Sequence, residues 1–172
     1  MAGAFGTRAP EARAHASSSP FRRGERTLKM TDGKQPTILV VDDDVDFVAF
    51  VATVLDGAGF RVITAYDGVE GLERARETLP DLVTLDIQMP RKTGVLFYRQ
   101  FKADARLRSV PVVIATGLRQ ANSYAAPFVD AFFEFNDPAI PKPDAFLDKP
   151  FDKESLLSLV RAKLAAPRKP EP

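Results

Sequence analysis

The sequence predicts an α/β fold in which helices cover both faces of a doubly wound, five-stranded parallel sheet. Two observations support it. From Thr37 onward, short runs rich in Val, Ile and Leu alternate with segments whose apolar residues recur at helical spacing. Strands that alternate with helices form right-handed βαβ units, which build a parallel sheet with helices on both sides. The chain has 172 residues, enough for one domain with a sizeable core and too few for two ordinary ones.

Five segments are predicted as strands because each is a short run rich in β-favouring residues. They are Ile38–Val41, Arg61–Ala65, Leu82–Leu85, Val110–Thr116 and Ala145–Lys149.

The intervening segments are predicted as helices from apolar residues three and four positions apart. They run from Phe47 to Leu55, from Val69 to Ala75, from Val95 onward and from Leu156 to Leu164. Gly57 and Gly59 end the first helix. Asp152 can cap the last one, where Phe151 and Leu156 are spaced for a hydrophobic staple.

The two ends of the chain are predicted to be disordered. Residues 1–36 hold seven Lys and Arg against three Asp and Glu, so 24 − 7 = 17 basic and 23 − 3 = 20 acidic residues remain elsewhere. The body is mildly acidic and lacks the charge of a nucleic-acid binder. The basic extension also has the composition of an organelle transit peptide. Another interpretation is that translation starts at Met30, so that residues 1–29 do not belong to the natural protein. Residues 166–172 form the second predicted tail.

Composition excludes several kinds of chemistry. The chain has no cysteine, and its single histidine, His15, lies in the predicted disordered extension. Thiol chemistry, disulfides, histidine-based metal sites and Ser-His-Asp catalysis are therefore excluded. No apolar run approaches the roughly 20 residues of a membrane span, so the sequence predicts a soluble, cytoplasmic protein.

The run "TILVVDDDVDFVAF" ends a predicted buried strand in three consecutive aspartates, Asp42 to Asp44. Adjacent carboxylates repel one another and lose hydration at the edge of a core. No basic residue lies nearby in the sequence before Arg61, so we expect the compensating charge to come from elsewhere in the fold. We interpret Asp44 as a loop or helix-start residue rather than a ligand.

Polar residues follow or end four of the predicted strands. They are Asp42 and Asp43, Asp86, Thr116 and Lys149. In a parallel sheet, the carboxyl ends of the strands meet at one edge, where binding sites form. Three carboxylates at one edge require a cation, and oxygen ligands without His or Cys favour Mg²⁺, with Mn²⁺ as an alternative.

Four motifs resemble those of the receiver domain of two-component response regulators, in its stand-alone, single-domain form. They are "LVVDDD", "PDLVTLDIQMPRKTG", "VVIATG" and "FLDKPF", and the resemblance covers roughly residues 37–165. It implies a flavodoxin-like, three-layer α/β/α fold. It also implies a phosphoprotein that receives a phosphoryl group and catalyses its own phosphorylation and dephosphorylation, without being a classical enzyme.

Site roles follow from the resemblance. Asp86 would be the phosphoryl acceptor. Asp42, Asp43, Asp86 and the backbone carbonyl of Gln88 would hold Mg²⁺. Lys149 would pair first with Asp86 and later with a phosphoryl oxygen, forming part of the phosphoryl-binding site.

The resemblance also implies a conformational switch. The hydroxyl of Thr116 would contact the phosphoryl group, Gly117 would leave room for the movement, and Phe146 would swing into the vacated space. Gln88 and Leu118 would flank the path of an attacking water, and Leu118 offers that water no hydrogen bond. Slow self-hydrolysis of the phosphorylated form is therefore expected.

Partners implied by the resemblance are other proteins. The phosphoryl donor would be a phosphohistidine on a sensor histidine kinase or a histidine phosphotransfer protein, and the output a downstream protein target. No DNA-binding domain is expected after Leu164. The apolar residues Phe47, Phe50 and Val51 of the first helix are expected mostly in the core.

Two alternatives remain open. A pseudo-receiver would act as a protein-interaction module without accepting phosphate. A haloacid-dehalogenase-like phosphatase also uses a strand-end Asp and Mg²⁺, but it needs a general acid two residues later, where this chain has Gln88.

The interval from 117 to 145 is longer than expected and crowded with aromatics and prolines. Pro127 to Phe135 is predicted as a short helix, because Pro suits its start and Pro138 blocks its continuation. Its apolar residues exceed one face. This predicts a docking patch for a partner or for a homodimer, with a simple cover for the sheet as the alternative.

Overall fold

The computed structural model describes residues 35–90, 93–117 and 141–167. Three predictions lie outside these residues: most of the disordered extension, the short helix from Pro127 to Phe135, and most of the C-terminal tail. Leu118 also lies outside them.

The described strands form one parallel sheet in the order β2-β1-β3-β4-β5. The strands are β1 (Thr37–Val41), β2 (Arg61–Ala65), β3 (Leu82–Leu85), β4 (Val112–Thr116) and β5 (Ala145–Asp148). This is the flavodoxin-like order, in which the chain reverses its direction of winding between β1 and β3. The predicted fold is confirmed, and a crevice for a site is expected at the carboxyl ends of these two strands.

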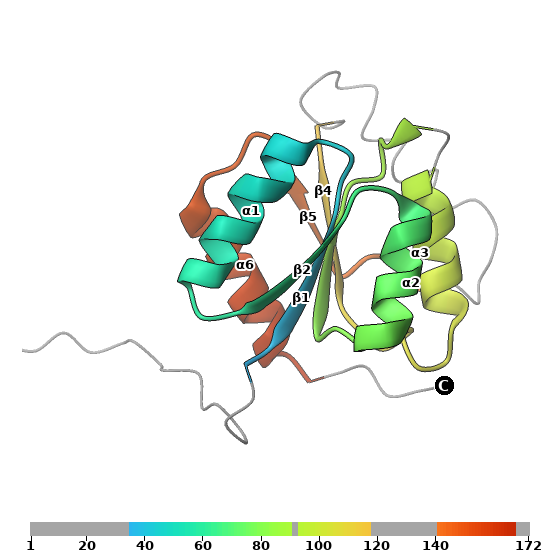
Figure 1. The fold of residues 1–172 in the computed structure, drawn as a ribbon. Coiled ribbons are helices and arrows are strands. Elements are labelled where there is room, and N and C mark those ends of the chain that lie inside the picture. Colours follow the sequence, from blue (N-terminus) through green and yellow to red (C-terminus); the bar gives the residue numbers. More distant parts are fainter. Residues whose placement is uncertain (1–34, 91–92, 118–140, 168–172) are drawn as a thin grey trace, which may run out of the picture.

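Helices cover both faces of the sheet (Figure 1). They are α1 (Val45–Gly57), α2 (Gly68–Thr78), α3 (Thr93–Ala103) and α6 (Lys153–Ala165). Helices α1 and α6 lie on one face, and α2 and α3 lie on the other. Within the described residues, no helix combines the length and the hydropathy that a membrane crossing requires.

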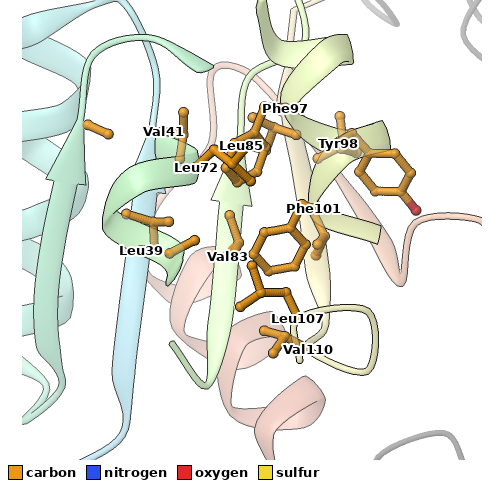
Figure 2. Close-up of a cluster of buried hydrophobic side chains, with 14 of the residues drawn as sticks. Leu39, Val41, Leu72, Val83, Leu85, Phe97, Tyr98, Phe101, Leu107 and Val110 are labelled. Atoms are coloured by element: carbon orange, nitrogen blue, oxygen red, sulfur yellow. The ribbon is translucent and has the colours of Figure 1, made fainter. Parts of the chain in front are cut away.

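The apolar core has two parts because successive side chains of a buried strand point to opposite faces. In β1, Ile38 and Val40 join the cluster beneath α1 and α6, whereas Leu39 and Val41 join the cluster beneath α2 and α3. Figure 2 shows the second cluster, where Phe97 and other side chains of α3 meet the strands. Each fully buried aliphatic or aromatic side chain stabilises the fold by about 1.5–3 kcal/mol.

Aspartates fix the starts of three helices. The carboxylates of Asp44, Asp67 and Asp152 accept hydrogen bonds from backbone N–H groups in the first turns of α1, α2 and α6. These bonds satisfy donors that have no partner within the helix. The interpretation of Asp44 as a helix-start residue and the cap at Asp152 are confirmed.

Several element boundaries differ from the prediction, by one to four residues. Strand β4 begins at Val112 rather than Val110, because the N–H of Val110 bonds the Leu107 carbonyl in a turn and Pro111 has no N–H to pair. Helix α3 begins at Thr93, before the predicted start at Val95, and it ends at Ala103. Strand β5 ends at Asp148, one residue before Lys149.

Two apolar residues of the helical patterns are exposed. Phe50 in α1 is 42% exposed and Val69 in α2 is 65% exposed. The buried stripe of α1 consists instead of Val48, Val51 and Leu55, which lie three and four positions apart. Phe50 lies outside that stripe, whereas Phe47 is half-buried against the core and Val51 is buried. The expectation that most of these three residues lie in the core is therefore confirmed, with Phe50 as the exception.

A buried lysine joins α3 to the edge of the sheet opposite the strands' carboxyl ends. Lys102 is 2% exposed, and its Nζ donates to the Val110 carbonyl at 2.6 Å and to the Arg108 carbonyl at 3.2 Å. The carboxylate of Asp144 lies 3.6 Å from this Nζ and also accepts the N–H of Val112 at 2.9 Å. This carboxylate therefore neutralises a buried charge and holds the start of β4.

Asp144→Ala is expected to lower the free energy of unfolding by about 3 kcal/mol, because it leaves the buried ammonium of Lys102 without its carboxylate. Urea denaturation monitored by circular dichroism measures this. The matched control is Arg76→Ala, which breaks the more exposed ion pair of Arg76 with Asp104. Exposed pairs contribute below about 1 kcal/mol, and equal losses for the two variants would contradict the prediction.

Candidate functional site

The strand register places two aspartates side by side. Val41 at the end of β1 pairs with Leu85 at the end of β3, and Asp42 and Asp86 are the next residues of these two strands. The N–H of Asp86 donates to the Val41 carbonyl at 2.9 Å, which fixes the backbone of Asp86 to β1. The predicted convergence of these residues at one edge of the sheet is confirmed.

Three carboxylates form an acidic cluster at this edge. Asp42, Asp43 and Asp86 each offer an oxygen, and these oxygens all lie within 4.8 Å of one another. Asp42 is 2% exposed and Asp86 is 8% exposed, whereas Asp43 lies open to solvent. The cluster therefore joins two buried carboxylates to one that solvent can reach.

Lys149 supplies the positive charge that the sequence required. It directly follows β5, and its Nζ lies 2.5 Å from Asp42 Oδ2 and 2.9 Å from Asp86 Oδ2. Its side chain reaches past β4, which separates β5 from β3 in the sheet. The predicted pairing with Asp86 is confirmed, and the pairing with Asp42 is an additional finding.

Burial and charge act in opposite directions on these groups. Burial raises the pKa of Asp42, although the hydrogen bond from Lys149 acts to lower it. Burial acts to lower the pKa of Lys149, but hydrogen bonds to Asp42 and Asp86 outweigh it and raise that pKa. The ammonium of Lys149 therefore stays charged at neutral pH, which suits it for binding a phosphoryl oxygen.

Backbone N–H groups orient the buried carboxylates. Gln88 N donates to Asp86 Oδ1 at 2.7 Å, and Asp44 N donates to Asp42 Oδ1 at 3.1 Å. Each carboxylate thus has one oxygen held by the backbone and the other held by Lys149. The predicted metal contact of the Gln88 carbonyl stays a prediction.

The donor set fits a hard divalent cation. All three side chains offer carboxylate oxygens, and three carboxylates with one ammonium leave a formal charge of −3 + 1 = −2. Mg²⁺ is bound in proteins through one or two carboxylates together with waters and substrate oxygens. The exposed Asp43 leaves the cluster open on the solvent side, where waters and a phosphoryl group can complete the coordination.

The predicted switch residues lie at the same edge. Thr116 ends β4 and pairs with Asp148, the last residue of β5. Gly117 follows, and a Cβ added there would lie 3.7 Å from the side-chain oxygen of Gln88. Phe146 in β5 is half-buried and packs against the core cluster beneath α2 and α3. Their roles in a conformational change stay predictions.

The sequence did not reveal two residues next to the site. The Phe47 ring in α1 lies against Lys149, with 4.0 Å between its centroid and the Lys149 Nζ. Gly94, at the second position of α3, presses against the backbone of Asp86. The motif around Asp86 included Gly94, but its spacing alone gave no reason for this contact.

The chain is similar to known proteins. The sequence profile of the response regulator receiver domain matches residues 38–161. The DNA-binding dual master transcriptional regulator RpaA of Synechocystis sp. is 35% identical over 129 residues, which cover 75% of this chain and 49% of RpaA. The DNA-binding response regulator MtrA of Mycobacterium tuberculosis is 34% identical over 133 residues, covering 77% of this chain and 52% of MtrA.

Solved structures of response regulators resemble this chain as well. A putative response regulator from Chloroflexus aurantiacus superposes with a TM-score of 0.65 at 29% identity, covering 77% of this chain and 100% of that protein. The chemotaxis protein CheY4 of Vibrio cholerae gives a TM-score of 0.63 at 25% identity, covering 76% of this chain and 99% of that protein. The chain spans about half the length of the curated relatives RpaA and MtrA. On the profile match and these relatives, the chain belongs to the family of response regulator receiver domains.

Proposed function

We propose that this protein is a phosphoacceptor receiver in a two-component or phosphorelay system, and that Asp86 accepts the phosphoryl group. One observation carries the proposal. The carboxylate of Asp86 is held between the backbone N–H of Gln88 and the ammonium of Lys149, beside the carboxylates of Asp42 and Asp43. A carboxylate fixed in this way is oriented for attack on phosphorus.

The proposed reaction is an in-line displacement. An oxygen of Asp86 attacks the phosphorus of a partner's phosphohistidine and forms a P–O bond while the P–N bond breaks. The electron pair of that bond leaves with the imidazole nitrogen, which then takes a proton from solvent. The product is an acyl phosphate on Asp86, and no other co-reactant is needed.

The chain's own residues support this step electrostatically. Lys149 offers its ammonium to a phosphoryl oxygen at the position where it now contacts Asp86. Asp42, Asp43, Asp86 and the Gln88 carbonyl would hold Mg²⁺, which neutralises phosphoryl oxygens when bound. Because these groups come from the receiver, it would catalyse its own phosphorylation from a small donor as well.

Phosphorylation of Asp86 would change the surface that the protein presents to its partners. The new phosphoryl group would attract the hydroxyl of Thr116 at the end of β4, with Gly117 giving room for the shift. Phe146, two strand positions before the end of β5, would follow. We propose that the signal passes to a downstream protein in the cytoplasm, with a sensor histidine kinase or a histidine phosphotransfer protein as donor and the 117–145 region as a surface for a partner or a homodimer.

Incubation with acetyl phosphate tests the proposal and separates the alternatives. With Mg²⁺ present, intact-mass spectra are expected to show one stable phosphoryl adduct, and peptide mapping is expected to place it on Asp86. Chelation of Mg²⁺ with EDTA is expected to prevent it. Release of inorganic phosphate over many turnovers without an adduct would favour the phosphatase, and no reaction at all would favour the pseudo-receiver.

A further inference from the structure

An aromatic ring covers one side of the site lysine. The Nζ of Lys149 lies 4.0 Å from the centroid of the Phe47 ring. A cation within about 6 Å of a ring centroid is attracted by the negative face of the π-system. The same ammonium donates to Asp42 and Asp86. Lys149 therefore has three neighbours that attract it, of which two are anions and one is a neutral ring.

Phe47 is held in place through its backbone and through its ring. The backbone N–H of Phe47 donates to the N-cap carboxylate of Asp44 at 3.0 Å, which fixes Phe47 in the first turn of α1. Its ring meets the Phe151 ring edge to face, with centroids 5.3 Å apart and an interplanar angle of 80°. Phe47 thus sits on a capped helix end and against the residue that precedes the cap of α6.

The ring attracts the ammonium of Lys149 without accepting one of its strong hydrogen bonds, which the carboxylates do accept. An ammonium has three N–H donors, and Lys149 directs two of them to Asp42 and Asp86. When a phosphoryl group arrives on Asp86, the contact between Lys149 and that carboxylate must give way to one with a phosphoryl oxygen. The ring attracts the ammonium without competing for that hydrogen bond, because its face accepts no strong one.

We propose that Phe47 is a positioning residue, which keeps the ammonium of Lys149 over the acidic cluster while its partner changes from a carboxylate to a phosphoryl oxygen. The part that concerns phosphoryl transfer rests on the proposed function. The part that concerns the attraction between ring and ammonium does not, because it is a property of the resting protein.

A double-mutant cycle isolates the attraction. Phe47→Leu also removes packing, since Phe47 lies against the core cluster beneath α1 and α6. Unfolding of the wild type, Phe47→Leu, Lys149→Met and the double variant is measured in urea without Mg²⁺. The unfolding constants are expected to show a coupling factor of about five between the two positions, about 1 kcal/mol at 25 °C. Coupling within the error of the measurement would overturn the attraction.

Phosphorylation by acetyl phosphate tests the positioning role. Phe47→Leu is expected to lower the maximal labelling rate about fivefold, and Phe47→Tyr, which keeps the ring face, is expected to stay within about twofold of the wild type. The control in the same helix is Phe50→Leu, because Phe50 is exposed and its ring lies 6.4 Å from the Phe47 ring, centroid to centroid. This variant alters the packing around Phe47 but keeps the ring that faces Lys149. It is expected to label at the wild-type rate.

The outcomes separate the two proposals. Equal rate losses for Phe47→Leu and Phe47→Tyr would overturn the positioning role, as would equal losses for Phe47→Leu and Phe50→Leu. If the wild type takes up no phosphoryl group while the cycle shows coupling, the proposed function fails and the contact between ring and ammonium stands.

Discussion

Asp86→Asn is expected to abolish Mg²⁺-dependent phosphorylation by acetyl phosphate. The amide that replaces the carboxylate is not a nucleophile, so no acyl phosphate can form at this position. The change also removes one of the three carboxylates that would hold the cation. Intact-mass spectra of the variant are expected to show no adduct under conditions that label the wild type fully.

The fold of this variant is expected to persist. Lys149 keeps its hydrogen bond to Asp42, and the change lowers the repulsion among the clustered carboxylates. The matched control is Asp44→Asn, because Asp44 caps α1 and lies outside the acidic cluster, and Asn caps helices as well as Asp. It is expected to label like the wild type. An adduct on Asp86→Asn, or its loss in Asp44→Asn, would contradict the assignment of the acceptor.

The strands that form the centre of the sheet could be predicted from sequence because burial on both faces requires continuous apolar runs. β1 and β3 satisfy that rule, and their bounds differ from the prediction by at most one residue. The apolar run of β4 begins at Val110, because Val110 and Pro111 are as apolar as the strand itself. The strand begins only after these two residues. There the hydrogen bonds of a turn decide the boundary, and apolar periodicity carries no information about them.

The site could be predicted in outline for a topological reason. Residues that follow parallel strands must share one edge of the sheet, so Asp42, Asp86 and Lys149 converge whatever their distance in sequence. The sequence could not predict that Asp42 is buried while its neighbour Asp43 is exposed. That difference depends on which way each side chain leaves the end of β1, and adjacent residues point in opposite directions.

Contacts between the helices and the site could not be predicted from the sequence. Phe47 has the helical spacing of a core residue, and its half-buried ring does pack on the core. Its contact with Lys149 depends on how α1 and the loop after β5 lie across the sheet. Apolar patterning reports which residues are buried, and it does not report which polar group they touch.

The same limit applies to Gly94, which leads to the second large expected effect. A Cβ added at Gly94 would lie 2.2 Å from the carbonyl oxygen of Asp86 and 2.8 Å from the Cα of Ile87. Both are backbone atoms, so no side chain can rotate away to make room. A methyl group at this position must push the start of α3 and the backbone of Asp86 apart by roughly 1 Å, whereas close-packed interiors tolerate little overpacking.

Gly94→Ala is therefore expected to lower the free energy of unfolding by about 2–3 kcal/mol and to lower the labelling rate of Asp86 about 10²-fold. The rate falls because displacement of this backbone moves the carboxylate away from Lys149 and from the N–H of Gln88. Urea denaturation measures the first effect, and the time course of labelling under native conditions measures the second.

The matched control is Gly57→Ala at the end of α1, where an added Cβ meets nothing within 4 Å. Alanine in a helix restricts the unfolded chain more than glycine does, so this control is expected to be neutral or slightly stabilised and to label normally. A Gly94→Ala variant that behaves like Gly57→Ala would show that the acceptor's position does not depend on the close contact with α3.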